Sequence, residues 1–341
     1  RSRYAEISAR LSQLSSDFSN HVLDATQAYY KVLSEDQLKG LPPSSVELLK
    51  QYGQQRELEQ PVATLDIPAY LAIMTYADDR ALRETLYQAY TTRASDQSDQ
   101  SEFDNTPIME EILRLRQEMA QLLGFNNYAE LSLASKMAPS VEAVDQFLRE
   151  LAEHARAPAE QEIAELKAIA AQDGIDTLQP WDTGYYSEKL KLQQFNLSQE
   201  MLKPYFPAPK VVEGLFSIVK RLYDVDIIER TAPVWHPDAR YFELEEQGQV
   251  IGGFYFDLYA RTGKRGGAWM SGFRSRMQLT QGLQKPICYM VCNFTPPVAD
   301  QPALLTHDEV ITLFHEFGHG LHHMLTEVDN IAVAGTHGVA W

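Results

Sequence analysis

Cysteine is scarce in this sequence, with only two residues, Cys288 and Cys292, among 341. They lie four positions apart in the apolar run KPICYMVCNF, which is typical of a strand, and they do not form a CxxC motif. So few cysteines exclude a disulfide framework, and this spacing is not that of a zinc or redox site. The cysteine content suits a reducing compartment, so we expect a cytoplasmic protein.

Long apolar runs are also missing, and no stretch approaches the roughly 18 residues that a membrane-spanning helix needs. The first residues, RSRYAEISARL, lack the apolar segment and the cleavage site of a secretory signal peptide. They also lack an initiator methionine and open directly in a helical pattern. We therefore expect a fragment of a longer chain, without its N-terminal part.

Positive charge is in short supply, because 30 lysines and arginines face 47 aspartates and glutamates, for a net charge of −17. A surface this acidic repels the phosphates of nucleic acids and of anionic lipids, so we expect neither nucleic acid nor membrane as a partner. The acidity mildly favours neutral or cationic ligands. Solubility alone explains it equally well.

Helical patterns dominate the first two thirds of the chain, and none of them repeats at a fixed period. We predict helices over residues 1–34, 41–52, 67–94, 109–125, 141–172 and 210–223, with a polar loop at 95–107. The amino-acid composition changes near Pro233, where aromatic and β-branched residues become frequent. These runs predict a hairpin about Gln247-Gly248-Gln249, a glycine turn at KRGGAWM and a further strand at KPICYMVCNF. The expected class is mainly α, with a helical region over 1–232 and a second region over 233–341 that carries a small sheet.

A final helix follows the sheet, and Thr306 with Glu309 forms a capping box at its start. On a helical wheel, six apolar residues form a core stripe: Val310, Leu313, Phe314, Phe317, Leu321 and Met324. His315, His319 and His322 lie opposite, and no Lys or Arg occurs between 306 and 325. We expect this histidine face to border a cleft, and Gly318 and Gly320 to admit another backbone close by.

His315 and His319 are four residues apart, so their side chains are neighbours on one helix face and both imidazoles can bind one Zn²⁺. Glu316 lies beside the first of them, where its carboxylate can act as a general base on water. This is the HExxH arrangement of zinc peptidases. The alternative is a core helix with hydrogen-bonded histidines, but five histidines in one helix disfavour it.

A catalytic zinc needs a third protein ligand, and few donors follow His319. The remaining residues offer Glu327, Asp329 and His337, while His322 shares the histidine face but lies two turns beyond His315. We expect His322 to orient a ligand or contact the substrate, with direct ligation as the lesser alternative.

Several segments together resemble the thimet-oligopeptidase family of zinc metallopeptidases. The similar segments, in the family's order, are TRASDQ, FDNTPIMEEIL, LLGFNNYAELSLASKMA, QPWDTGYYSEK, PYFP, VWHPDARYFEL, FYFDLYARTGKRGGAWM and HDEVITLFHEFGHGLHHML. The resemblance implies a zincin-like helical body of two lobes around a deep channel that admits short unstructured peptides. It also implies His315 and His319 as zinc ligands and Glu316 as the base. The third ligand would be a glutamate beyond Trp341, after a run similar to GTHGVAW (335–341), and the residues that stabilise the intermediate would follow it.

The implied activity is zinc-dependent endopeptidase cleavage of short peptides, including cytosolic peptide fragments, by a monomer. The sheet would hold the substrate as an added strand, with Gly266 and Gly267 allowing close backbone approach, or these are simply turn glycines. Two other classes stay open. The fragment would be an inactive helical scaffold if two ligands hold zinc too weakly, or a zinc hydrolase acting on another bond.

Overall fold

The computed structural model describes residues 1–297 and 302–338. Helices account for most of the ordered backbone, which confirms the predicted mainly α class. The α-helices are α1 (Ser2–Ala28), α2 (Pro43–Gln54), α3 (Ile67–Tyr76), α4 (Arg80–Thr92), α5 (Thr106–Leu122), α6 (Tyr128–Leu133), α7 (Val141–Gln172), α8 (Thr183–Phe195), α9 (Gln199–Leu202), α10 (Ala208–Tyr223) and α11 (His307–Met324). Short 3₁₀ turns are η1 (Glu35–Leu38), η2 (Ser101–Phe103), η3 (Pro180–Asp182) and η4 (Lys203–Tyr205). Within the described ranges, no helix has the length and apolar character to cross a bilayer.

The strands form one larger sheet and two small ribbons. They are β1 (Tyr30–Val32), β2 (Val62–Thr64), β3 (Asp226–Arg230), β4 (Arg240–Glu246), β5 (Gln249–Tyr259), β6 (Trp269–Arg274), β7 (Met277–Leu279), β8 (Gly282–Gln284) and β9 (Ile287–Phe294). The larger sheet has the order β3-β4-β5-β9-β6, with β5 and β9 parallel and the other pairs antiparallel. β1 pairs with β2, and β7 pairs with β8.

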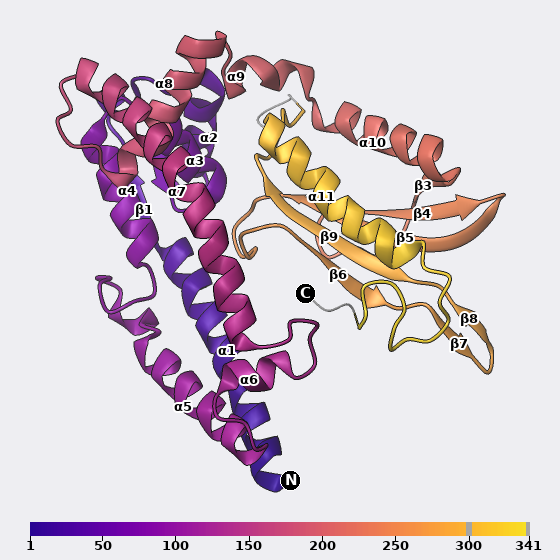
Figure 1. Cartoon of the computed structure of the whole chain (residues 1–341). Coiled ribbons are helices and arrows are strands. Elements are labelled where there is room, and N and C mark those ends of the chain that lie inside the picture. Colours follow the sequence, from indigo (N-terminus) through magenta and orange to yellow (C-terminus); the bar gives the residue numbers. More distant parts are fainter. Residues whose placement is uncertain (298–301, 339–341) are drawn as a thin grey trace.

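The chain divides visibly into a helical part and a part built on the sheet. Figure 1 shows α1 to α8 on one side, the sheet with α10 and α11 on the other, and the N-terminus at the far end of α1. One hydrophobic cluster lies within residues 33–86, in the helical part. Another joins the sheet to α10 and α11, and it takes in residues from 208 to 324.

Both α10 and α11 cover the same face of the larger sheet (Figure 1). Phe242, Phe254 and Phe256 point to that face and are buried there. Phe216 of α10 and Phe317 of α11 meet them, with ring centroids 5.2 Å apart for Phe216 and Phe242 and 5.4 Å for Phe254 and Phe317. Aromatic burial of this size fixes the position of α11 on the sheet.

The structure corrects some predicted boundaries. The first helix ends at Ala28, not at residue 34, because Tyr29 is extended and Tyr30–Val32 pairs with β2. The glycine turn is real, but the chain from Trp269 onward forms the edge strand β6. The hairpin turns at Gln247 and Gly248, as predicted, since both have positive φ.

The predicted division at residues 232 and 233 stays a prediction. β3 and α10 precede it, although both belong to the sheet part. The composition change near Pro233 therefore follows the first strand of the sheet instead of preceding it.

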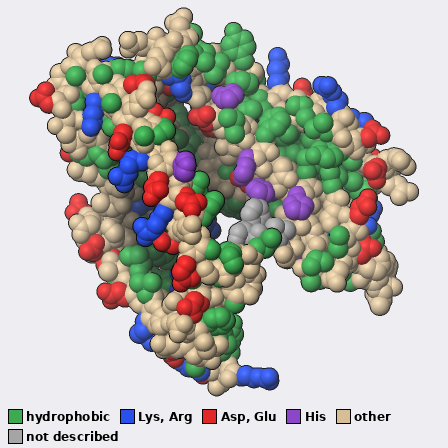
Figure 2. Space-filling model, in the orientation of Figure 1, with side chains coloured by type: hydrophobic (Ala, Val, Ile, Leu, Met, Phe, Trp, Pro, Cys, Tyr) green, Lys and Arg blue, Asp and Glu red, His purple; other side chains and the backbone are tan. Residues whose placement is uncertain are grey.

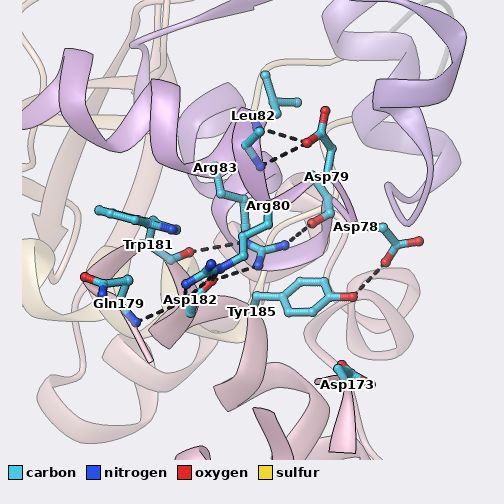
Figure 3. A network of polar contacts seen from close by, with 12 residues as sticks. Asp78, Asp79, Arg80, Leu82, Arg83, Asp173, Gln179, Trp181, Asp182 and Tyr185 are labelled. Atoms are coloured by element: carbon cyan, nitrogen blue, oxygen red, sulfur yellow. Dashed lines mark hydrogen bonds and ion pairs between the residues drawn. The ribbon is translucent and has the colours of Figure 1, made fainter. Parts of the chain in front are cut away.

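A buried ion cluster holds α4 against η3 at the start of α8 (Figure 3). Asp182 is fully buried and accepts hydrogen bonds from both Arg80 and Arg83. Arg83, also buried, donates to the backbone carbonyls of Ala77 and Trp181. The guanidiniums thus tie α4 to two segments at once and stiffen the helical part.

Candidate active site

The histidine helix α11 starts where the sequence predicts. The Glu309 amide donates to Thr306 Oγ1 at 3.1 Å, and the Thr306 amide donates to Glu309 Oε2 at 2.8 Å, which confirms the capping box. Glu309 Oε1 also accepts from the Thr295 amide at 2.9 Å, just after β9. Burial raises the pKa of the Glu309 carboxyl, although these hydrogen bonds oppose the rise. The carboxylate therefore fixes the start of the helix to the end of the strand.

The buried face of α11 is rotated from the predicted stripe. Leu313, Phe317 and Met324 are fully buried, as predicted, but Phe314 is 36% exposed and does not belong to the core. The burial extends instead to Glu316 and His323, at 8% and 1% exposure. On a helix of 100° per residue this corresponds to a rotation of roughly 60°.

The two glycines of α11 have different environments. A Cβ on Gly320 would lie 2.7 Å from Met290 Sδ of β9, so the helix does approach the sheet closely there, although the neighbouring atoms belong to side chains and not to the backbone that was predicted. A Cβ on Gly318 would meet no atom of the described residues within 4 Å, so the same prediction is wrong for Gly318. Gly320 brings the helix close to the sheet, and Gly318 lies on its open side.

His315 and His319 converge. Their Nε2 atoms lie 3.1 Å apart, and their rings are nearly perpendicular, with centroids 4.7 Å apart. Two nitrogens that bind one tetrahedral Zn²⁺ at about 2.0–2.1 Å lie about 3.3 Å from each other. The pair therefore fits a shared zinc ion with very little movement, and these side chains would supply two of its ligands.

Glu316 lies on the flank of this pair. Its side chain is buried on the side of α11 that faces the sheet. Burial raises the pKa of the Cys292 thiol to about 12, and the charge of Glu316 contributes to the rise. The carboxylate is thus near β9, and the thiol stays protonated at neutral pH, which agrees with a structural role for this cysteine.

Among the residues that the structure describes, no group of three or more His, Cys, Asp or Glu side chains could hold a metal ion. His322 is exposed, and the geometry gives no support to it as a third ligand. Asp329 accepts instead from Arg276 Nε at 2.6 Å. The glutamate that the resemblance implies as third ligand stays a prediction, and residues 339–341 are outside the described ranges.

Sequence reasoning assigned no role to His323. Its Nε2 lies 3.0 Å from the carbonyl oxygen of Arg274, so it connects α11 to the edge strand β6. Burial lowers the pKa of His323, and hydrogen bonds to the backbone oppose this effect. On the helical wheel His323 lies between the apolar stripe and the histidine face, and this position was the only signal in the sequence for its burial.

A cavity with a volume of about 790 Å³ lies between the helical part and the sheet part. Thr312 of α11 lines it one turn before His315 and Glu316, and so do Gly266 and Gly267. Across from them the lining comes from α1, α2 and α3. Figure 2 shows the hollow between the two parts, with histidine side chains along the rim on the side of α11. The predicted glycines therefore open toward the same space as the candidate zinc helix.

Comparison with known proteins places this arrangement in a family. The chain is 53% identical to "Oligopeptidase A" of Salmonella typhimurium and also to that of Escherichia coli, over 99% of this chain and 51% of each relative. It is 36% identical to "Dipeptidyl carboxypeptidase" of Escherichia coli, over 95% of this chain and 48% of that protein. The chain thus spans about half the length of these relatives.

A family description covers most of the sequence as well. Residues 73–341 match "Peptidase family M3", a range that includes the HExxH helix, the sheet and most of the helical part. Two imidazoles in position for one metal ion, with a carboxylate beside them, are what a metallopeptidase of such a family requires. The chain belongs to peptidase family M3.

Proposed function

We propose that the protein is a zinc-dependent endopeptidase that hydrolyses short unstructured peptides, including peptide fragments in the cytosol, as a monomer. The observation that supports this most directly is the 3.1 Å separation of the His315 and His319 Nε2 atoms, with Glu316 on the next position of the helix. The names of its relatives, oligopeptidase A and dipeptidyl carboxypeptidase, agree with peptide substrates.

In this proposal His315 and His319 hold the zinc ion, and a glutamate beyond Trp341 completes the ligand set. When bound, zinc polarises the scissile carbonyl and makes water more acidic. Glu316 accepts the proton of the attacking water and returns it to the nitrogen of the leaving amine. Its burial keeps bulk water away from the carboxylate, so the proton passes between reacting groups and not to solvent.

The preference for unstructured peptides follows from the shape of the site. The cavity, of about 790 Å³, is a suitable size for a few residues in extended form and much too small for a folded domain. β6 is the last strand in the order of the sheet, so its outer edge is available to an added strand. Gly266 and Gly267 leave open space beside that edge, and we assign them to close contact with the peptide backbone.

The test is Glu316→Gln in the full-length protein. We expect the variant to keep its zinc, measured by elemental analysis, while its turnover of a quenched-fluorescent peptide falls by at least about 10²-fold. Glu213→Gln is the matched control, because Glu213 is exposed on α10, away from the histidine helix. Turnover of Glu316→Gln close to that of the control would remove Glu316 from this role.

The rival reading is a scaffold without activity. It is favoured by one observation, namely that the described residues bring only two donors together. Zinc analysis of the 341-residue chain beside the full-length protein separates the two readings. A full-length protein that retains no zinc and cleaves no peptide would support the scaffold.

A further inference from the structure

The edge strand β6 and the helix α11 run in the same direction past the histidine pair. The start of β6 follows Ala268, which lines the cavity together with Thr312 of α11. The end of β6 reaches Arg274, whose carbonyl oxygen contacts His323 near the end of α11. A peptide along β6 and across the histidines therefore has one end at the cavity and the other near Arg274.

The turn before β6 is held firmly where it borders the cavity. Lys264 Nζ donates to Asp257 Oδ1, to the Asp257 carbonyl and to the Tyr259 carbonyl at 2.8–2.9 Å. Asn293 Nδ2 donates to the carbonyls of Arg265 and Gly267 at 2.9 and 2.7 Å. These contacts fix the backbone on both sides of Gly266, so the side chain of Arg265 is presented from a defined position.

Arg265 is the most exposed of the cations that line the cavity. Lys264 is bound to Asp257, and Lys203 forms an ion pair with Glu200 at 2.7 Å. Arg93 also has no carboxylate partner among the described residues, but it is only partly exposed, it donates to the Tyr90 carbonyl, and its guanidinium lies 3.6 Å from the centroid of the Tyr90 ring. Within residues 1–297 and 302–338, Arg265 has no carboxylate partner, and its guanidinium lies 5.8 Å from the centroid of the Trp269 ring.

A guanidinium that is exposed at a cavity, carried on a fixed backbone and without a carboxylate partner is suited to a carboxylate of the ligand. Antiparallel pairing is the more stable way to add a strand to β6. It would place the C-terminal end of the peptide at the cavity, the same end that carries Arg265. Charge and strand direction thus point to the same orientation, even though the chain as a whole is strongly acidic.

We propose that Arg265 binds a carboxylate on the C-terminal side of the scissile bond, and that the cavity receives the residues that follow this bond. This inference rests on the proposed peptidase function for the position of the scissile bond. The ligand chemistry is a carboxylate, from the peptide terminus or from an Asp or Glu side chain. Arg265 would thereby set both the orientation of the peptide and a preference among short substrates.

The test measures binding separately from cleavage. Fluorescein-labelled peptides of one sequence, with a free C-terminal acid or with an amide, are titrated into zinc-loaded full-length protein that carries Glu316→Gln. We expect the acid to bind about tenfold more tightly than the amide, and Arg265→Gln to abolish the difference without weakening the amide. A third peptide, the amide with a glutamate near its C-terminus, shows whether a side-chain carboxylate serves equally. Lys210→Gln, on the exposed surface of α10, is the control.

The outcomes separate the two claims. Equal binding of acid and amide, or a preference that survives Arg265→Gln, overturns the role of Arg265 even if the protein with Glu316 intact cleaves the peptides. A different result is that the acid binds more tightly than the amide only when Arg265 is present, while the protein with Glu316 intact cleaves none of the peptides. That result overturns the peptidase function and leaves the carboxylate site standing.

Discussion

Arg83 Nη2 lies 3.0 Å from Asp182 Oδ1, and the two side chains are 2% and 0% exposed. This pair is the inner half of the cluster in Figure 3, since the neighbouring Arg80 reaches the same carboxylate from the surface with a side chain that is 38% exposed. Removing a buried partner costs more than removing an exposed one, because water readily replaces an exposed group but not a buried one.

We therefore predict that Arg83→Met lowers the free energy of unfolding by about 3 kcal/mol, from the lost pair and from the orphaned carbonyls of Ala77 and Trp181. Arg80→Met, the matched control, should lower it by about 1 kcal/mol or less. Urea unfolding followed by circular dichroism measures both. Equal losses in the two variants would show that burial does not set the strength of this cluster.

The Asp257 carboxylate predicts a pH-dependent contribution to stability. Burial alone would raise its pKa, but hydrogen bonds from Arg261, Lys264 and Trp235 lower it from 3.8 to about 2. A lowered pKa in the folded state stabilises the fold above pH 4 by about 2 kcal/mol, and this contribution is lost as the pH falls toward 2. The difference in unfolding free energy between wild type and Asp257→Asn should thus shrink by about 1 kcal/mol between pH 6 and pH 3.

Urea unfolding at a series of pH values tests this, with Asp96→Asn as the control because Asp96 is exposed and makes no ion pair in the described part of the chain. A constant difference across the range, or one that grows toward low pH, would contradict the assigned pKa. The direction matters, because a carboxyl with a raised pKa would give the opposite trend.

The two glycines of α11 provide a second matched pair. Gly318→Ala should stabilise the protein by about 0.5–1 kcal/mol, because alanine favours the helix and the new methyl group meets open space. Gly320→Ala should destabilise it by about 1 kcal/mol, because Met290 is fully buried and has to move from the added Cβ. Thermal unfolding of both variants gives the signs, and the same sign for both would mean that the helix does not sit against β9 as described.

The histidine helix shows how far the sequence alone could lead. Its start, its capping box and the convergent imidazoles follow from local spacing, so they could be predicted. The orientation of its buried face could not, because the count of apolar side chains gave no weight to Gly320. That glycine lets α11 approach β9, which turns Glu316 and His323 toward the sheet and Phe314 toward solvent.

The sheet, in contrast to the helix, could be predicted from the sequence only in part. The predicted glycine turn took in Trp269 and Met270, and the rest of β6 was not predicted as a strand, because Ser271 and Gly272 dilute its apolar pattern and most of its residues are exposed at the edge. The parallel pairing of β5 with β9 joins residues such as Gly253 and Ile287, which are 34 positions apart, and no local pattern encodes such a contact. The cavity is still less visible in the sequence, since its lining is drawn from segments between residues 18 and 312.

The last prediction concerns which imidazoles hold zinc. His315→Ala and His319→Ala should each weaken zinc binding by at least about 100-fold in the full-length protein, because each removes one of two convergent nitrogens. His322→Ala should leave the zinc content unchanged, because His322 is exposed and lies about 10.5 Å along the helix axis from His315.

Competition with a chromophoric chelator measures the zinc affinity of each variant, and circular dichroism confirms that the helix persists. If His322→Ala lost zinc as readily as His319→Ala, the ligand set would have to include His322, and the glutamate expected beyond Trp341 would no longer be needed to complete it.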